Sequence, residues 1–387
     1  MPSGDRLAVG LNLLYLVEGS AGAGRYGLEL LGALKRVEPQ TRVVAFVGRD
    51  ASLRLFSQPW STEIEWVRLP VRITNRTHLL AQMLALPALA AQRSLDILHS
   101  PANIGPPAAP RVARVVTLLD LIWLHQREAW DASRAGRAMG TLSRSSARRA
   151  DRVIAISNAA RDDFVTNLGL DPLCIDVTPL GVNAPTTAEP EREAELQRRL
   201  AIDGAQVVLC VAQKRPYKNL AALVRAAAQL EERPLVVLVG APTPHEEELR
   251  RLAAELGVQE QVRFVGWLSE ADLEAVYRLA ACFVLPSLIE GFGLPVLEAM
   301  ARDVPVACSN RTAMAEVAGD AALLFDPADQ QAVTESIRRL LRDRELASSL
   351  VQRGRERVRV FTWERTGAAS FASYRRAVAA KRSSARK

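Results

Sequence analysis

Short runs of continuous apolar residues alternate with longer helical patterns along the chain, and this alternation is what most constrains the fold. Strands that are apolar on both faces belong to a sheet covered on both sides, which favours parallel βαβ architecture. The candidate strands form two series, first 7–14, 41–48, 63–70, 96–100, 114–121 and 152–157, then 207–212, 234–240, 262–267, 282–287, 304–309 and 321–325. The sequence therefore predicts an α/β protein with two doubly wound, Rossmann-like domains.

The length of 387 residues also favours two or three domains over a single core. Pro, Gly and Thr concentrate in 177–190, between the two series, so we expect the junction there. The predicted domains are 1–182 and 183–362. Ligands of open α/β sheets lie at the carboxyl ends of the strands, so we expect the site in a cleft where the two domains face each other.

Two glutamates, Glu290 and Glu298, lie in the very apolar segment 286–310, PSLIEGFGLPVLEAMARDVPVACSN. GFG is typical of a turn and Pro295 suits the first turn of a helix, so Glu290 would lie on a loop and Glu298 about one turn into the helix. Buried carboxylates need hydrogen-bond partners, and sugar or ribose hydroxyls would serve. Glycine amides near a helix N-terminus favour an anion such as a diphosphate. The alternative is that Glu298 caps backbone amides and Glu290 is merely exposed.

A basic loop follows the first strand of the second domain, within VAQKRPYKNLAALVRAA (211–227), and precedes a helix that opens near Asn219. Arg215 and Lys218 would project from this loop into the cleft. The forked donors of Arg and the point charge of Lys together suit a diphosphate. A solvated basic loop is the alternative.

Three glycines, Gly22, Gly24 and Gly27, form a literal G-x-G-x-x-G, which invites a nicotinamide-cofactor interpretation. The dinucleotide fingerprint follows its strand immediately, whereas the predicted strand here ends near Leu14. The fingerprint also requires an acidic residue at the end of the next strand, and here Asp50 comes only after Gly48, beyond that strand. We therefore interpret the segment as a glycine-rich lid that faces the cleft. An NAD-dependent oxidoreductase that uses these glycines stays open as the alternative function.

The net charge of +7 and the pI of about 9.6 are partly due to basic clusters at 144–152 and 375–387. Such a surplus attracts anionic partners, but an aromatic content of 5% without basic–aromatic interleaving argues against nucleic acid. The apolar run 79–91 is too short to span a bilayer. The basic tail and the segment 71–91 instead suggest peripheral contact with an anionic membrane.

The four cysteines are isolated in sequence and lack the spacing of a zinc site. Three of them, Cys210, Cys282 and Cys308, lie in apolar strand-like runs, whereas Cys174 does not. Together with the lack of a visible N-terminal targeting segment, this predicts reduced core thiols in a cytoplasmic protein.

These motifs together resemble glycosyltransferase family 4, a large family of retaining nucleotide-sugar enzymes with the two-domain GT-B fold. EGFGLPVLEAMA matches the family's E-x7-E signature, and the stretch around it, 282–327, resembles the mannosyltransferase-like branch. GAGRYGLELLGAL (22–34) resembles the N-terminal loop and helix, RPYKNL (215–220) the phosphate-binding loop, and FTWERTGAASFASY (361–374) the closing segment. The resemblance implies that a C-terminal helix, 363–387, packs back on the first domain.

The resemblance also implies an activity: transfer of a hexose from a nucleotide-diphosphate sugar, either GDP-mannose or a UDP-sugar, to a glycan, lipid-linked or small-molecule acceptor. Glu290 would bind the donor sugar, while Arg215 and Lys218 neutralise the leaving diphosphate, and these three are the expected catalytic residues. Glu298 would hold the ribose hydroxyls. Further donor contacts are implied for Gly22, Gly24, Gly291, Phe292, Gly293 and Leu294. The basic residues replace a metal, so no metal or other cofactor is expected.

The chain departs from the family pattern at two positions. Leu119 precedes Asp120 in TLLDL, where many relatives carry a His that contacts the sugar. His99 or His125 could substitute for it beside Asp120, or the chain could be a nucleotide-sugar binder that has lost activity. Asp303 replaces a glycine that is usual in the turn before PV, and we expect only local consequences.

Overall fold

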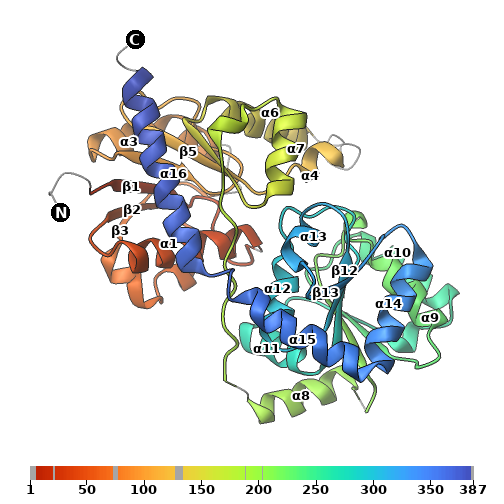
Figure 1. The fold of residues 1–387 in the computed structure, drawn as a ribbon. Coiled ribbons are helices and arrows are strands. Elements are labelled where there is room, and N and C mark those ends of the chain that lie inside the picture. The colour runs from red at the N-terminus through yellow and green to blue at the C-terminus, as the bar shows by residue number, and fades with distance from the viewer. Residues whose placement is uncertain are drawn as a thin grey trace. The chain divides into compact units, whose positions relative to one another are not determined.

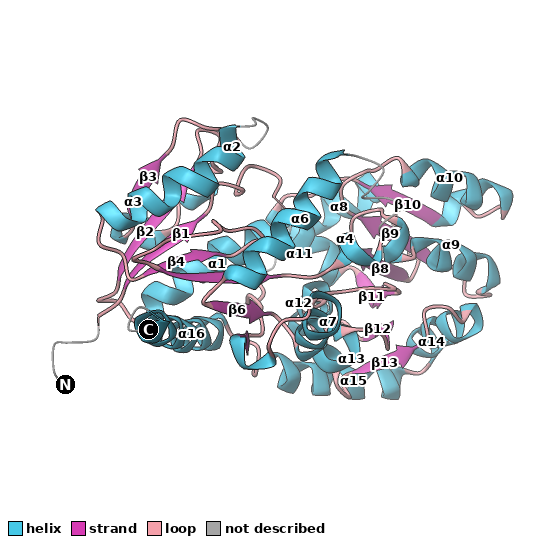
Figure 2. Ribbon diagram, turned by 90° about the horizontal axis from the view of Figure 1, so that it is seen from above, coloured by secondary structure: helices cyan, strands magenta, loops and turns pink. Residues whose placement is uncertain are grey.

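The computed structural model describes residues 6–20, 22–72, 77–126, 134–187, 189–202 and 204–384. These residues form two compact units, 1–181 together with 362–387, and 182–361 (Figure 1). The predicted domain limits were 182 and 362. Each unit contains its own parallel sheet with helices on both sides of it (Figures 1 and 2), so the predicted fold class is confirmed.

The first unit is built on a seven-stranded sheet of order β3-β2-β1-β4-β5-β6-β7, in which all neighbours are parallel. Its strands are β1 Ala8–Asn12, β2 Arg42–Val47, β3 Glu65–Arg68, β4 Ile97–Ser100, β5 Ala113–Leu118, β6 Arg152–Ala155 and β7 Ile175–Val177. All six strands predicted for this domain are present. The edge strand β7 was not predicted, because its three residues are too few to form a recognisable apolar run.

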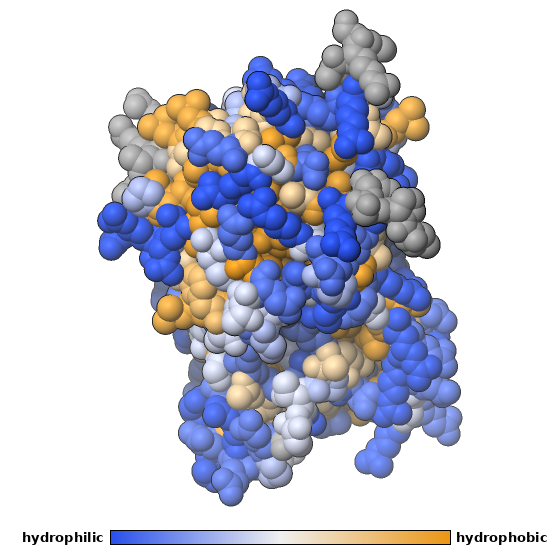
Figure 3. All heavy atoms as spheres, turned by 90° about the vertical axis from the view of Figure 1, so that its left-hand side faces the viewer, coloured by the Kyte–Doolittle hydropathy of each residue, from blue (hydrophilic) through white to orange (hydrophobic). Residues whose placement is uncertain are grey.

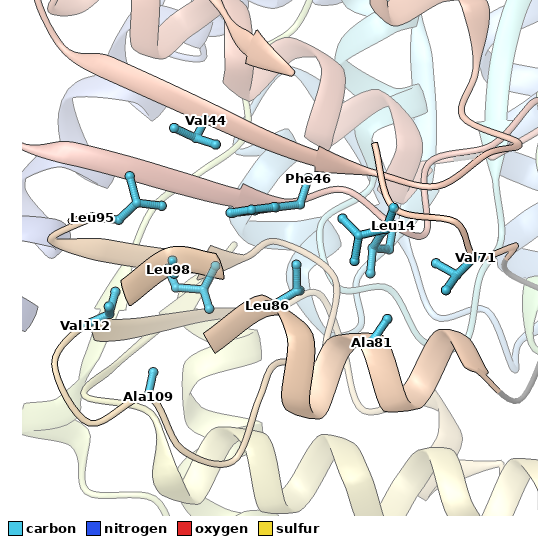
Figure 4. Close-up of a cluster of buried hydrophobic side chains, with 12 residues drawn as sticks. Leu14, Val44, Phe46, Val71, Ala81, Leu86, Leu95, Leu98, Ala109 and Val112 are labelled. Atoms are coloured by element: carbon cyan, nitrogen blue, oxygen red, sulfur yellow. The ribbon is translucent and has the colours of Figure 1, made fainter. Parts of the chain in front are cut away.

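The helices of the first unit bury an apolar stripe against this sheet. They are α1 Gly22–Val37, α2 Thr77–Leu80, α3 Leu86–Gln92, α4 Ile122–His125, α6 Arg134–Arg149, α7 Asn158–Leu168 and α16 Trp363–Ser384, with a π-helical stretch at Ala81–Ala85 between α2 and α3. Figure 4 shows one core cluster, in which Ala81 and Leu86 point toward Leu14, Phe46 and Leu98 of the sheet side. None of the described helices combines the length and the apolar composition that crossing a bilayer requires.

The second unit has a six-stranded parallel sheet of order β10-β9-β8-β11-β12-β13. Its strands are β8 Val207–Val211, β9 Leu235–Val239, β10 Val262–Val265, β11 Ala280–Leu285, β12 Val306–Ser309 and β13 Ala322–Phe325. Its helices are α8 Pro190–Leu200, α9 Leu220–Gln229, α10 His245–Glu255, α11 Glu270–Arg278, α12 Leu294–Ala301, α13 Ala313–Ala318, α14 Gln330–Arg342 and α15 Arg344–Val358. The central strands β8, β9, β11 and β12 are mostly buried, as their continuous apolar runs predict, whereas the edge strands β10 and β13 are only partly buried.

The direction of winding reverses between β8 and β11. From β8 the chain proceeds outward through β9 to β10, then returns to place β11 on the other side of β8. The loops that follow β8 and β11 therefore diverge to opposite faces of the sheet and leave a crevice at the carboxyl ends of the strands. Ligands of doubly wound sheets bind at this switch point, which makes these two loops the first place to look for chemistry.

The last helix, α16, returns to the first unit and packs against α1, where Gly367 allows close approach because a Cβ there would lie 3.0 Å from the carbonyl oxygen of Ala33. Its Tyr374 hydroxyl lies 2.8 Å from Nδ1 of His99 in β4, and Nε2 of His99 lies 2.8 Å from Oγ1 of Thr117 in β5. Because this cluster is fully buried, the pKa of His99 is lowered to about 3 and the ring is neutral.

The turn before β12 holds Asp303 at a φ of 60°, a left-handed conformation that glycine adopts more easily. Its carboxylate receives two hydrogen bonds from Arg355 in α15, at 2.6 and 2.7 Å, and this pairing lowers the pKa of Asp303. An aspartate held by Arg355 thus adopts a conformation that suits glycine.

The buried imidazole predicts how stability depends on pH. The folded pKa of His99, about 3, lies below the ordinary value of 6.5, so the unfolded chain binds more protons between these values and stability falls as pH decreases through that range. The slope from this group is about 1.4 kcal/mol per pH unit below about pH 6. His99→Gln should therefore lose that part of the slope, measured by denaturant unfolding between pH 7 and pH 4.5. Parallel stability curves for the variant and the wild type would contradict this assignment.

Candidate active site

Glu290 and Lys218 meet at the switch point of the second sheet. Glu290 lies on the loop between β11 and α12, and Lys218 on the loop between β8 and α9. The Lys218 Nζ lies 2.5 Å from Glu290 Oε1, and the hydroxyl of Ser287 donates to the same oxygen at 2.8 Å. The Lys218 and Glu290 side chains are only 14% and 10% exposed, so the pair is mostly shielded from solvent. Glu290 is therefore not merely an exposed residue.

The local sequence explains why the Glu290 loop turns as it does. Gly293 has a φ of 94°, and a Cβ there would lie 2.5 Å from the sulfur of Met314, so both backbone conformation and space require glycine. Pro295 then begins α12 in a first-turn position. The backbone amide of Glu290 donates to Oγ1 of Thr312 at 3.0 Å, so the loop is also held from the segment after β12.

The loop after β8 is a single 3-10 turn, Pro216–Lys218, followed by Asn219 at a φ of 54°. The Asn219 side chain donates to the carbonyl of Pro327, and the amide of Leu288 donates to the carbonyl of Tyr217, each at 2.8 Å. These bonds fix the two loops of the site to each other and to the sheet edge. Arg215 is exposed, and its guanidinium makes no hydrogen bond or ion pair with the described residues.

A buried lysine that sequence reasoning missed stands under this loop. The side chain of Lys214 has no exposed surface, and its Nζ donates to the carbonyls of Gly240 at 2.5 Å and Val265 at 2.8 Å. A carboxylate oxygen of Glu246 lies 3.4 Å away, and burial lowers the pKa of Lys214. Lys214 therefore ties the loop after β8 to the ends of β9 and β10. No signal in the sequence separates it from its neighbour Arg215.

Glu298, in α12, is buried and accepts a hydrogen bond from the hydroxyl of Tyr277 at 2.9 Å. Below it, Arg302 donates to the Glu298 backbone carbonyl at 3.0 Å and pairs with Glu274 at 2.6 Å. The carboxylate thus has a side-chain partner from α11. Tyr277 is a residue of this neighbourhood that the sequence did not single out.

The start of α12 offers backbone donors beside the ion pair. The amides of Phe292, Gly293 and Leu294 form no hydrogen bond with the described residues, as expected for the first turn of a helix. Phe292 itself is buried, with its ring edge-on to Phe361 at a centroid distance of 5.8 Å. Open amides, a helix N-terminus and a lysine in one place form a suitable site for an anion.

In the first unit, the glycine-rich segment is helical and is not a lid loop, which corrects our expectation. β1 ends at Asn12 and α1 begins at Gly22, so the glycines do not follow the strand directly as a dinucleotide fingerprint does. Gly24 and Gly27 have packing roles, since a Cβ would lie 2.5 Å from the Ser20 Cβ and from the Tyr15 hydroxyl, respectively.

The three residues considered for the acceptor side do not come together as one group. Asp120 accepts the amide of Ile122, the first residue of α4, at 3.1 Å, while His125 pairs with Asp163 at 2.9 Å. His99 is fully buried with both ring nitrogens engaged, so it holds α16 on the sheet and is not available to a sugar. The expectation that His99 could take the place of the histidine missing at position 119 is therefore wrong.

The described residues contain no group of three or more His, Cys, Asp or Glu side chains placed to hold a metal ion. Cys210, Cys282 and Cys308 are buried, and burial raises each thiol pKa to about 12. Cys174 is exposed and unpaired. The three buried cysteines therefore serve packing. The groups gathered at the site are lysine, glutamate and backbone amides.

Comparison with known proteins decides the family. Residues 20–186 match the model for Glycosyltransferase Family 4, and residues 191–357 match the model for Glycosyl transferases group 1. The chain belongs to the family 4 glycosyltransferases. The resemblance inferred from the glutamate pair and the basic loop is thus confirmed, and the matched regions coincide closely with the two units.

Two curated glycosyltransferases illustrate the relationship. An MMP alpha-(1->4)-mannosyltransferase from Mycolicibacterium hassiacum is 33% identical over a region covering 60% of this chain and 56% of that protein. A D-inositol 3-phosphate glycosyltransferase from Kineococcus radiotolerans is 29% identical over 96% of this chain and 91% of its own length. The chain spans about half the length of several of the relatives it matches, the mannosyltransferase included.

Among solved structures, a sucrose-phosphate synthase from Thermosynechococcus elongatus has a TM-score of 0.75 at 23% identity and covers 96% of this chain and 98% of its own. At this identity the likeness shows the fold alone. With the two parallel sheets described above, it confirms the GT-B architecture.

The buried lysine gives a test of how the site is supported. Lys214→Met should remove the Nζ donor of the Gly240 carbonyl, one of the two donors of the Val265 carbonyl, and the cation beside Oε2 of Glu246. This loss costs about 1–3 kcal/mol of unfolding free energy. Arg215→Met is the matched control, because its exposed side chain should change stability by no more than about 0.5 kcal/mol. Equal stability of the two variants in denaturant unfolding would show that Lys214 does not support the loop.

Proposed function

We propose that this protein is a retaining hexosyltransferase that moves a sugar, mannose foremost, from a nucleotide-diphosphate sugar to an acceptor hydroxyl. The observation that carries the proposal is the contact of Lys218 with Glu290 at the switch point, beside the open amides of α12. A cation and free amides suit the diphosphate, and a carboxylate suits the sugar hydroxyls. Both halves of the donor thus have a complementary group in one place.

The reaction exchanges one glycosidic bond for another. The bond from the anomeric carbon to the diphosphate oxygen breaks, a bond to the acceptor oxygen forms on the same face, and the acceptor proton passes to the departing diphosphate. Negative charge grows on the diphosphate as the bond breaks. Lys218, Arg215 and the amides of Phe292, Gly293 and Leu294 would stabilise that charge, which is the largest contribution a preorganised site can make. These groups would do so without a metal ion.

Glu290 would bind hydroxyls of the donor sugar and so set the position of its anomeric carbon, which is catalysis by orientation. Glu298 would bind the ribose hydroxyls. A mannosyltransferase among the relatives supports mannose, with GDP-mannose as our proposed donor and a UDP-sugar as the alternative. We propose a glycan, a lipid-linked molecule or a small molecule as the acceptor class, and the relative named a D-inositol 3-phosphate glycosyltransferase supports a small molecule.

The test is a thermal-shift and transfer screen of GDP, UDP, ADP, dTDP and their common sugar conjugates, with NAD(H) included and EDTA present. A ligand at ~100 times its dissociation constant adds about 2.7 kcal/mol to stability, enough for a visible shift. We expect one diphosphate and its sugar conjugate to stabilise the protein selectively. A shift with NAD(H) alone would favour the oxidoreductase alternative, and donor binding without transfer would favour an inactive binder.

Variants of the ion pair separate the two expected roles. Glu290→Gln should lower the transfer rate by about a hundredfold or more yet bind the free nucleoside diphosphate at least as tightly, because Lys218 loses a competing carboxylate. Lys218→Ala should weaken diphosphate binding as well as transfer. Glu335→Gln and Arg338→Ala, which change an exposed ion pair on α14, are matched controls and should leave both unchanged. Near-normal turnover in Glu290→Gln or Lys218→Ala would exclude these assignments.

We also propose that the protein works in the cytoplasm, in contact with an anionic membrane through the helical segment that ends in α3. Leu80 and Leu84 are 60% and 68% exposed and lie four positions apart in this segment, on one side of it. Figure 3, which views the side where α3 lies in Figure 1, shows apolar surface interspersed with polar residues. Residues 73–76 of the expected 71–91 segment lie outside the described residues. The buried, unpaired thiols support a reducing compartment.

The basic tail contributes less to this proposal than its sequence suggested. Arg375 pairs with Glu38, Arg376 with Asp176, and Lys381 lies 3.8 Å from a carboxylate oxygen of Asp151. These bases hold α16 on the first unit, so their charge is largely matched within the protein. Residues 385–387 of the expected tail lie outside the described residues.

Co-sedimentation with vesicles tests the membrane contact. Binding to vesicles rich in phosphatidylglycerol should fall by about tenfold in a Leu80→Ser, Leu84→Ser double variant, since two exposed leucines lose their apolar contact. Leu173→Ser, which alters a leucine that is 80% exposed elsewhere in the first unit, is the matched control. Equal binding by the double variant and the control would rule out this segment as the lipid contact.

A further inference from the structure

Thr312, between β12 and α13, has a backbone conformation that threonine rarely adopts. Its φ is 55° and its ψ is −133°, which lies outside the regions open to L-residues and is worst for a β-branched side chain. Gly319, at the other end of the same helix, has nearly the same angles, 58° and −134°. The geometry therefore suits a glycine at both ends of α13, and the chain uses one at only one of them.

The Thr312 hydroxyl has a definite role in this position. Its Oγ1 accepts the backbone amide of Glu290 at 3.0 Å and donates to the carbonyl of Arg311 at 2.8 Å. Donation to Arg311 orients the hydroxyl so that a lone pair faces the amide of Glu290. A glycine at 312 would have no strain and no such contact.

The contact connects two loops that no backbone ladder joins. Glu290 follows β11 and Thr312 follows the neighbouring strand β12, so the bond bridges adjacent strand ends at the site. The Glu290 carboxylate is already held by Lys218 and Ser287, and the Thr312 hydroxyl fixes its main chain. Side chain and backbone of Glu290 are thus anchored from separate elements.

We propose that Thr312 is a positioning residue for Glu290, retained in a strained conformation because its hydroxyl sets the height and direction of the glutamate over the donor sugar. Strained residues concentrate at functional sites, where the surrounding structure holds them in place. The inference rests on the proposed function. It adds a residue that acts through Glu290 and touches neither the diphosphate nor the reacting atoms.

Substitutions at 312 separate the hydroxyl from the strain. Thr312→Val keeps the shape and removes the hydroxyl, Thr312→Ser keeps the hydroxyl, and Thr312→Gly removes both hydroxyl and strain. We expect the transfer kcat to fall at least tenfold in the Val and Gly variants, with the Ser variant within about threefold of the wild type. The melting temperature should rise by a few degrees in Thr312→Gly although its activity falls. The dissociation constant for the free nucleoside diphosphate should not change in any of them.

Gly319→Ala is the matched control at the twin position. An alanine there would keep a φ of 58°, and its Cβ would lie 3.3 Å from Nε of Arg357. This variant should therefore lose stability but keep the wild-type kcat. A fall in kcat for Gly319→Ala equal to that for Thr312→Val would mean that the rate follows stability alone. That result would overturn the positioning role.

Amide hydrogen exchange tests the hydrogen bond between the Glu290 amide and Thr312 independently of any activity assay. Exchange at the Glu290 amide should be at least tenfold faster in Thr312→Val than in the wild type, and near wild type in Thr312→Ser. Unchanged exchange in Thr312→Val overturns the inference whatever the activities are. If the wild-type protein transfers no sugar from any donor, the proposed function is overturned. Faster exchange in Thr312→Val would then show that the contact has a structural role only. Active wild type with full kcat in Thr312→Val overturns the inference and leaves the proposed function standing.

Discussion

The burial of the second sheet on both faces is the constraint from which its site follows. With helices packed on either side, polar groups that must meet a ligand can be placed only where strands end. The chain returns from β10 to place β11 beside β8, so the loops after these two strands are fixed near each other by the sheet. Lys218 and Glu290 contact each other across 72 positions of sequence for this reason.

The charged side chains near the site fall into two groups according to their partners. Lys214 and Glu274 are buried and satisfied by fixed partners, the former by strand-end carbonyls and the latter by Arg302 and Arg278, so they stabilise the framework. Lys218 and Glu290 instead satisfy each other. In the proposed function each would bind a part of the donor, so ligand binding would exchange this ion pair for contacts with the ligand.

The first unit shows how a chain end is anchored. Tyr374 of α16 reaches His99, which continues through Thr117 to Tyr26 of α1, so one buried polar chain joins two helices to two strands. The basic residues of α16 pair with acids of the same unit. Part of the net positive charge that suggested an external anionic partner is therefore used within the protein.

The sequence by itself determined the strand series, the doubly wound class, the loop position of Glu290 and the helical position of Glu298, because burial and turn chemistry are local properties of the residues. It also singled out Lys218 and Arg215 correctly as residues of one loop. Only the tertiary structure decided that Lys214 is buried while Arg215 is exposed, that Thr312 holds the Glu290 amide, and that His99 belongs to the core. Those outcomes depend on which strand ends become neighbours, and spatial order across a sheet is set by packing between segments that the local pattern does not encode.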